Sequence, residues 1–167
     1  VEYRQGAAEE TGLDAGSAFQ NLWYALYRAR PASGDSITIH VLPGLYSPSL
    51  TGERSVHARS YVSITGVDSG TTIFDRASGD GLIFCSNDSN LTVSGLQIRG
   101  SNASGGVIHL DHSKVLVTGC SIKNNGCVFC GGNGPSGIAC VNQTDAVITH
   151  NAILGTYGIG IVCEQSS

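Results

Sequence analysis

What the sequence lacks excludes several classes of protein. Methionine is absent, only 13% of the 167 residues are charged, the net charge is −4, and the lysines are Lys114 and Lys123. Without a basic cluster, nucleic acid is not expected as a partner. No apolar run approaches the ~18 residues of a transmembrane helix, so no membrane span is expected. Because the chain starts at Val1 without a signal peptide, we expect a processed product or part of a larger protein.

The residues that are present favour β-structure, with one exception. There are 23 glycines, while glutamate and lysine, which fill surface helices, are scarce. Residues 17–31 nevertheless predict a helix, in which Ser17 and Gln20 match a capping box and Pro31 ends the helix. Its apolar stripe consists of Phe19, Leu22, Trp23, Leu26 and Tyr27.

Two strand patterns repeat after residue 60. In the first pattern, two apolar residues separated by one other residue precede a turn, and a further apolar residue follows the turn. It occurs at 61–75, 90–101, 114–125 and 145–156. The second is a single strand, at 81–88, 106–113, 137–144 and 158–165. Short strands repeated in this way, with irregular Gly/Ser/Asn loops between them, indicate a parallel β-solenoid.

We therefore expect an all-β fold, a short parallel β-helix of about five coils. Residues 17–167 would form a single domain, in which the capping helix 17–31 shields the open edge of the first coil. Residues 1–16 are an extension too short to form a coil, and a candidate for contact with another subunit. A β-sandwich is the alternative, but no Asn-Gly hairpin turn joins consecutive strands.

Parts of the sequence resemble known β-helix proteins. The stretches SGDSITIHVLPGLYSPS and YVSITGVDSGTTIFD, with the helix before them, resemble the opening of right-handed parallel β-helices of the pectin-lyase-like superfamily. Residues 105–108 (GGVI) and 120–125 (CSIKNN) are similar to repeats of chlamydial polymorphic outer-membrane proteins and of algal and protist surface proteins. Gly119 replaces the usual Asn, and Ile122 the usual Phe. The resemblance spans 17–167 and implies a right-handed β-helix, while a fold alone does not imply a function.

Four glycosylation sequons and an even number of cysteines predict a secreted protein. The Asn-x-Ser/Thr triplets begin at Asn87, Asn90, Asn102 and Asn142, each beside turn-forming residues. Together with six cysteines, they predict an N-glycosylated eukaryotic protein that is extracellular or at the cell surface.

The cysteines are interpreted as structural disulfides. They are Cys85, Cys120, Cys127, Cys130, Cys140 and Cys163. CVFC at 127–130 has the spacing of a redox motif, and with Cys120 and Cys140 it would imitate a zinc site. A glycine-rich loop follows it, however, and no second CxxC does. Cys140 and Cys163 fall at equivalent positions of successive coils, which favours this pair.

The segment HLDHS raises the question of a catalytic or metal site. His109 and Asp111 share one face of a strand, and His112 is expected on the other. Two ligands leave a metal under-coordinated unless neighbouring coils supply more. The positions aligned with His109 are Phe84 and Cys140.

The positions aligned with Asp111 are Ser86 and Asn142, so neither set adds a carboxylate or an imidazole. His40 and His150 stand alone in the sequence. We therefore expect no catalytic residue, no metal and no cofactor.

Comparison with the enzymes of the superfamily leads to the same expectation. PGLYSPS resembles the first motif of pectin methylesterases only as far as Tyr46. Leu110-Asp111-His112 echoes pectate lyases, which also need several calcium-binding carboxylates and an arginine base on one face. The only arginine after residue 76 is Arg99, and the Gly-His-Gly of polygalacturonases is missing.

The expected function is a non-catalytic structural module in a glycosylated surface fibre, coat or adhesin. The alternatives are a pectin-type lyase or esterase and a passive carbohydrate-binding module. Candidate sugar-stacking residues for the last are Trp23, Tyr46, Tyr61 and Tyr157. The sequence stops at Ser167, one strand into a coil, so we expect either a longer native chain or docking on a neighbouring subunit.

Overall fold

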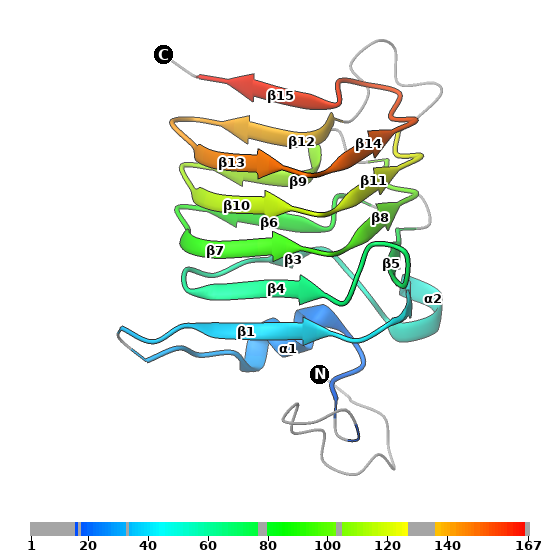
Figure 1. The fold of residues 1–167 in the computed structure, drawn as a ribbon, viewed down its shortest axis with the longest axis vertical. Helices are drawn as coiled ribbons and strands as arrows, with labels where there is room; N and C mark the ends of the chain where they lie inside the picture. Colours follow the sequence, from blue (N-terminus) through cyan, green and yellow to red (C-terminus); the bar gives the residue numbers. More distant parts are fainter. Residues whose placement is uncertain are drawn as a thin grey trace.

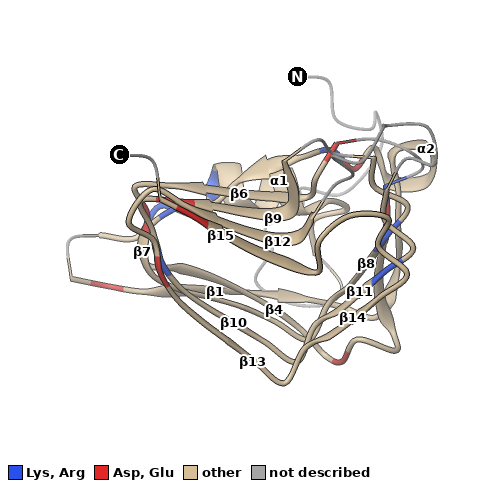
Figure 2. Ribbon diagram, turned by 90° about the horizontal axis from the view of Figure 1, so that it is seen from above, with Lys and Arg blue, Asp and Glu red and all other residues tan. Residues whose placement is uncertain are grey.

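The structure is a computed structural model that describes residues 16, 18–32, 34–76, 80–102, 105–126 and 136–165. Its strands stack into three parallel sheets, which form the three sides of a solenoid (Figures 1 and 2). Each coil adds one strand to each sheet, and the coils rise from the N-terminal to the C-terminal end of the molecule. Among the described residues, no helix is long and apolar enough to cross a membrane.

The three sheets have the same organisation. Sheet A contains, in spatial order, β1 (Ile37–Val41), β4 (Val62–Gly66), β7 (Ser89–Ser94), β10 (Lys114–Thr118) and β13 (Asp145–Thr149). Sheet B contains β2 (Gly44–Tyr46), β5 (Thr72–Asp75), β8 (Gln97–Arg99), β11 (Ser121–Lys123) and β14 (Ala152–Leu154). Sheet C contains β3 (Val56–His57), β6 (Ile83–Ser86), β9 (Gly106–Asp111), β12 (Ser136–Val141) and β15 (Ile161–Glu164). The predicted all-β solenoid of about five coils is confirmed, since each sheet is 5-stranded.

The core consists of inward side chains that stack from coil to coil. Val93 lies opposite Val117 in sheet A, and Val117 lies opposite Ile148. In sheet B, Ile98 lies opposite Ile122. All except Ile148, on the last coil, are fully buried. Each such burial stabilises the fold by about 1.5–3 kcal/mol. The registers confirm the first repeat pattern, because these residues hold equivalent positions in it.

The predicted alignment of the second repeat is wrong by one residue at β12. The glycine pattern places Gly106 beside Gly137, whereas the register pairs Gly106 with Ser136. The turn after β12 holds one residue more than the turn after β9. Two consecutive residues with left-handed backbone, Asn142 (φ 49) and Gln143 (φ 54), accommodate this residue.

A sharp turn of constant form joins sheet A to sheet B. Its central residue is left-handed in three successive coils, at Gly95 (φ 64), Gly119 (φ 63) and His150 (φ 55). Glycine adopts this conformation without the steric cost that a Cβ brings. Two residues separate β7 from β8 and β10 from β11, so the strand of sheet B begins almost immediately after that of sheet A.

The predicted helix exists but is shorter than expected. Helix α1 spans Leu22–Arg28, and its N-cap is Asn21, whose side chain accepts a hydrogen bond from the Tyr24 N–H at 3.0 Å. The predicted capping box is wrong, because Gln20 lies before the cap, and Ser17 is outside the described residues. The helix ends where Ala29 adopts extended backbone, two residues before Pro31.

Helix α1 covers the end of the first coil, as predicted. It packs against β3 and β1 (Figure 1). Its buried face consists of Leu22, Ala25 and Leu26, while Tyr27 is 60% exposed. The rest of the first coil includes the short helix α2 (Pro48–Thr51), which the sequence pattern does not reveal. The predicted extension 1–16 lies outside the described residues, except for Gly16.

Candidate functional site

The residues of the HLDHS segment lie on the outer face of sheet C. In β9, Ile108 and Leu110 point into the core and are fully buried, so His109 and Asp111 point outward. The His109 ring lies 6.0 Å from the ring of Phe84, measured between centroids. The Phe84 ring lies 5.7 Å from that of His57. Three rings from three successive coils therefore form a column along sheet C.

Asp111 is engaged by two neighbours. Its Oδ1 accepts a hydrogen bond from Asn142 Nδ2 at 2.8 Å and lies 2.7 Å from His112 Nδ1. These two hydrogen bonds, that of Asn142 first, hold the pKa of Asp111 below its usual range. The predicted orientation of His112 is wrong, because its left-handed backbone (φ 45) breaks the strand alternation and turns the ring toward Asp111. Asp111 is therefore a fixed carboxylate rather than a proton donor.

The coils next to His109 and Asp111 supply little further chemistry. In the register, Ala139 and not Cys140 lies opposite His109, and Val141 and not Asn142 lies opposite Asp111. On the other side, Phe84 and Ser86 lie opposite them as expected. Asn142 still contacts Asp111, because the longer turn brings its side chain back over the strand. Within the described ranges, no group of three or more His, Cys, Asp or Glu side chains is arranged to hold a metal ion.

His109 has one feature that an outward strand residue rarely has. Its Nδ1 is buried and has no hydrogen-bond partner among the described residues. A buried ring nitrogen without a partner loses solvation without compensation. The role of the His109 ring is therefore to pack against Phe84 in the column.

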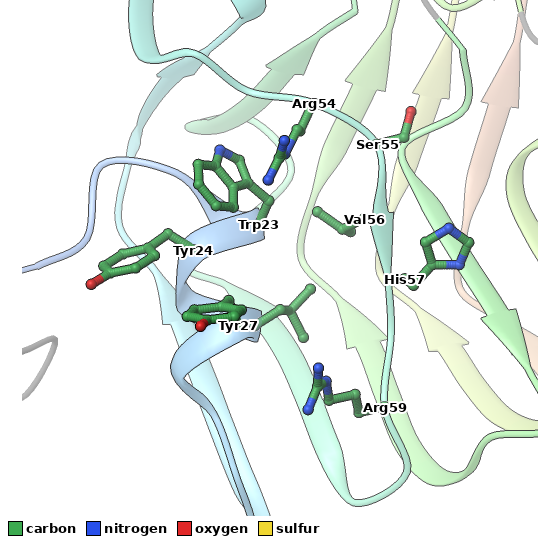
Figure 3. Close-up of a pocket in the computed structure, with 9 residues that line it drawn as sticks. Trp23, Tyr24, Tyr27, Arg54, Ser55, Val56, His57 and Arg59 are labelled. Carbon is green, nitrogen blue, oxygen red and sulfur yellow. The ribbon is translucent and has the colours of Figure 1, made fainter. Parts of the chain in front are cut away.

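A groove of about 640 Å³ opens between α1 and β3, at the first coil (Figure 3). Aromatic rings from the helix form one wall, and the segment around β3 forms the other. Its lining consists of Trp23, Tyr24, Leu26, Tyr27, Arg54, Ser55, Val56, His57 and Arg59. His57 also begins the ring column of sheet C, so the groove and the column meet at β3.

The charged side chains of this groove are cationic. The Arg54 guanidinium stacks over the Trp23 ring at 3.7 Å from its centroid. Two arginines beside the lining residues make similar contacts, since Arg28 lies over the Tyr24 ring at 5.9 Å and Arg30 over the Tyr27 ring at 5.4 Å. A cation held against an aromatic face gains attraction from the ring quadrupole. The groove can therefore bind planar or anionic groups, and none of its described lining residues is a carboxylate for acid–base chemistry.

A buried carboxylate beside the groove has a structural role. Glu53 is 2% exposed, and its Oε2 accepts a hydrogen bond from the Leu22 N–H at 2.8 Å. Its Oε1 accepts one from the Arg54 N–H at 3.2 Å. Burial raises the pKa of Glu53, although these N–H donors and the charge of Arg76 act in the opposite direction. Glu53 thus satisfies the first N–H of α1 and ties the helix to the first coil.

The groove is not apparent from the sequence analysis. One signal is present in the sequence, because Arg54, His57 and Arg59 lie within six residues of each other. β3 is only two residues long, so its period-2 pattern is too short to stand out.

The expected sugar-stacking residues do not form one surface. Tyr46 packs against Phe74, with ring centroids 4.9 Å apart, and its hydroxyl donates to the Leu42 carbonyl. Tyr157, 64% exposed, follows β14 on the last coil, whereas Trp23 lies at the first. Tyr46 and Trp23 each have one ring face covered, Trp23 by Arg54.

The predicted glycosylation sites differ in their surroundings. Asn87, Asn90 and Asn102 are exposed, and the first two adopt left-handed backbone with φ of 59 and 55. Asn142 is half-buried, and its Nδ2, the atom that would carry a glycan, donates to Asp111. Glycosylation stays a prediction, and at Asn142 it would compete with an existing hydrogen bond.

The cysteines fall into two groups. Cys85 and Cys120 are core residues, and burial raises the pKa of Cys85 to about 12 and that of Cys120 to about 11. Cys85 lies opposite Leu110, and Cys120 lies in the turn between β10 and β11. The register confirms the predicted alignment of Cys140 with Cys163. All four described cysteines are free thiols, and Cys127 and Cys130 lie outside the described residues.

Comparison with known proteins identifies one match. Residues 56–167 match the model of a family described as "right handed beta helix region". No curated protein and no solved structure matches the chain. The matched range begins at β3 and includes the coils from there to β15.

Proposed function

Because the chain belongs to the right-handed β-helix family, we propose that it is a non-catalytic structural module, secreted and glycosylated, that assembles through its last coil. A column of four isoleucines carries the proposal. Ile83, Ile108 and Ile138 are 0% exposed, whereas Ile161 at the equivalent position of the last coil is 43% exposed. A side chain of the core type is thus open to solvent where the next coil would cover it.

The backbone supports the same proposal. β13, β14 and β15 are the last strands of their sheets, so one edge of each has no partner strand among the described residues. Unpaired edges of this kind favour pairing with another chain. The occupant that we propose is a second copy, because β1 and β2 are also end strands of their sheets, each with one edge that has no partner strand among the described residues. Such a head-to-tail contact does not close on itself and builds a filament.

The outer polar residues support a structural rather than a catalytic role. The Arg99 Nε lies 2.9 Å from Asp75 Oδ2 and links β8 to β5. Ser94 Oγ donates to Thr65 Oγ1 at 3.2 Å and links β7 to β4. These groups bridge adjacent coils instead of converging on a cavity. A polysaccharide-cleaving enzyme would need acid and base groups facing a common substrate.

Light scattering over a range of concentrations tests the assembly. The mean particle mass of the wild-type protein is expected to increase with concentration. That of Ile161→Lys is expected to stay lower, because a charge replaces the apolar contact. The matched control is Leu154→Lys. Leu154 lies opposite Lys123 on the outer face of the same coil and is 58% exposed, so this variant should assemble like wild type.

Circular dichroism first establishes that both variants fold. A wild-type chain that stays monomeric at high concentration would overturn the proposal. So would equal assembly of the folded Ile161→Lys and Leu154→Lys variants.

A further inference from the structure

We infer that Cys140 and Cys163 form a disulfide through exchange with an external disulfide, and that this bond locks the last strand of sheet C onto the solenoid. The inference does not depend on self-assembly, since both cysteines belong to one chain. It assigns a covalent modification to a site that the family match leaves unassigned.

The strand register brings the two thiols together. Cys140 lies opposite Cys163, in the middle of the parallel pairing of β12 with β15. Neighbouring strands lie about 4.8 Å apart, within the Cα separation of disulfides, about 4.4–6.8 Å. Both side chains point the same way, because Cys140 follows the inward Ile138 by two residues and Cys163 follows Ile161 by two. Burial, and after it the neighbouring Cys163 thiol, raises the pKa of Cys140 to about 11.

The two thiols differ in access, which sets the order of reaction. Cys163 is exposed, whereas Cys140 is 7% exposed beneath it. An external disulfide therefore reaches Cys163 first. Cys85, in the same column, is separated from Cys140 by Leu110 and is fully buried. Cys85 therefore has no disulfide partner there.

The chemistry balances as two successive exchanges. The Cys163 thiol loses its proton, and its sulfur attacks one sulfur of the external disulfide and displaces the first small thiol. The Cys140 thiol then loses its proton, its sulfur attacks Cys163 Sγ, and the second small thiol leaves. Two electrons pass from the protein dithiol to the external disulfide, which is reduced to two thiols.

The bond would stabilise the weakest part of sheet C. The side chains of Ile161, Cys163 and Glu164 on β15 are exposed, and β12 is the partner strand of β15 among the described residues. A strand with few buried contacts opens locally more readily than the core. A disulfide between β12 and β15 closes a loop that includes β13 and β14, and so reduces the freedom of the opened state.

Peptide mapping of the folded chain tests the inference. The reduced protein is treated with oxidised glutathione, its remaining thiols are blocked, and it is cut after Lys123 and before Asp145. Cys163 is then alone in 145–167, whereas 124–144 contains Cys127, Cys130 and Cys140. We expect the two peptides to be joined until reductant is added. Cys140→Ser should abolish the link, and the double variant Cys127→Ser/Cys130→Ser should retain it.

A second readout tests the locking of β15. Cleavage of the folded protein by chymotrypsin at the exposed Tyr157 should slow about tenfold or more on oxidation, because the closed loop resists opening. The same treatment should leave the rate unchanged in Cys163→Ser. Separate peptides in oxidised wild type, or a link that persists in Cys140→Ser, would overturn the inference.

Discussion

In the turn between sheets A and B, comparison of two glycines distinguishes the cost of backbone strain from that of a steric clash. Gly95 and Gly119 hold equivalent positions with φ of 64 and 63. A Cβ on Gly119 would meet its nearest atom, the Gly95 nitrogen, at 3.9 Å. A Cβ on Gly95 would lie 2.6 Å from the carbonyl oxygen of Gly66, which belongs to the backbone and cannot turn aside.

The two alanine variants should therefore differ in stability. Gly119→Ala is expected to lower the free energy of unfolding by about 1–2 kcal/mol, the cost of a left-handed alanine. Gly95→Ala should cost a further 1–3 kcal/mol or so, because the coils must also move apart. Denaturant unfolding measures both. Equal losses would show that the approach of Gly66 to Gly95 is not tight in solution.

At the scale of elements, α1 is attached to the first coil through one buried titratable group, Glu53. Burial is the largest influence on Glu53 and raises its pKa in the folded state above the usual value of a glutamate side chain. A group with a raised pKa contributes stability below its unfolded-state pKa and loses this contribution as the pH rises through the folded-state value. The ionised form still accepts the hydrogen bonds of Leu22 and Arg54, so the helix stays anchored.

Glu53→Gln tests this pH dependence, since glutamine does not titrate. We expect the free energy of unfolding of wild type, minus that of the variant, to fall as the pH rises from 4 upward through about 4.5 and beyond. The other carboxyl groups are common to both proteins and cancel in the difference. Denaturant titrations at a series of pH values provide the measurement. A constant difference would contradict the raised pKa.

The strands after residue 60 are predictable because their signal is repeated. Val93 and Val117 hold equivalent positions in two copies of one pattern, and the structure pairs them. The shift at β12 is not predictable in the same way. A residue added in a turn leaves the apolar pattern of the next strand intact, and the two left-handed residues that absorb it, Asn142 and Gln143, carry no distinctive signal.

The helix illustrates a different limit. Its apolar face is visible in the sequence, but Asn21 rather than Ser17 caps it. Its first N–H is satisfied by Glu53, which lies 31 residues further along the chain. A partner so distant in sequence follows only from the folded first coil. Local capping rules therefore place the start of this helix too early.

At the scale of the whole molecule, the candidate site was only partly predictable. The outward positions of His109 and Asp111 follow from strand alternation, and both are observed. The groove at α1 was not predicted, because it combines Trp23 and Tyr27 of the helix with Arg54 and Arg59 of a segment without a repeat. Charged residues are sparse along the ribbon on all three sides of the solenoid (Figure 2), so composition alone does not distinguish the groove.

The two ends of the solenoid differ, which gives the molecule a direction. Helix α1 lies at the first coil (Figure 1) and covers the core there, whereas Ile161 on the last coil is exposed. A filament of identical subunits would place the last coil of one chain against β1 and β2 of the next. The N-glycans predicted at Asn87, Asn90 and Asn102 would then lie on exposed positions between the ends.

Amide hydrogen exchange, measured at low and at high protein concentration, tests the proposed assembly most directly. Pairing of the last coil predicts that exchange in 145–149 and 161–164 slows as the concentration rises. Exchange in β7, at Ser89–Ser94 within the solenoid, should not change. Exchange that is independent of concentration in the last coil, or that slows equally in β7, would contradict assembly through this end.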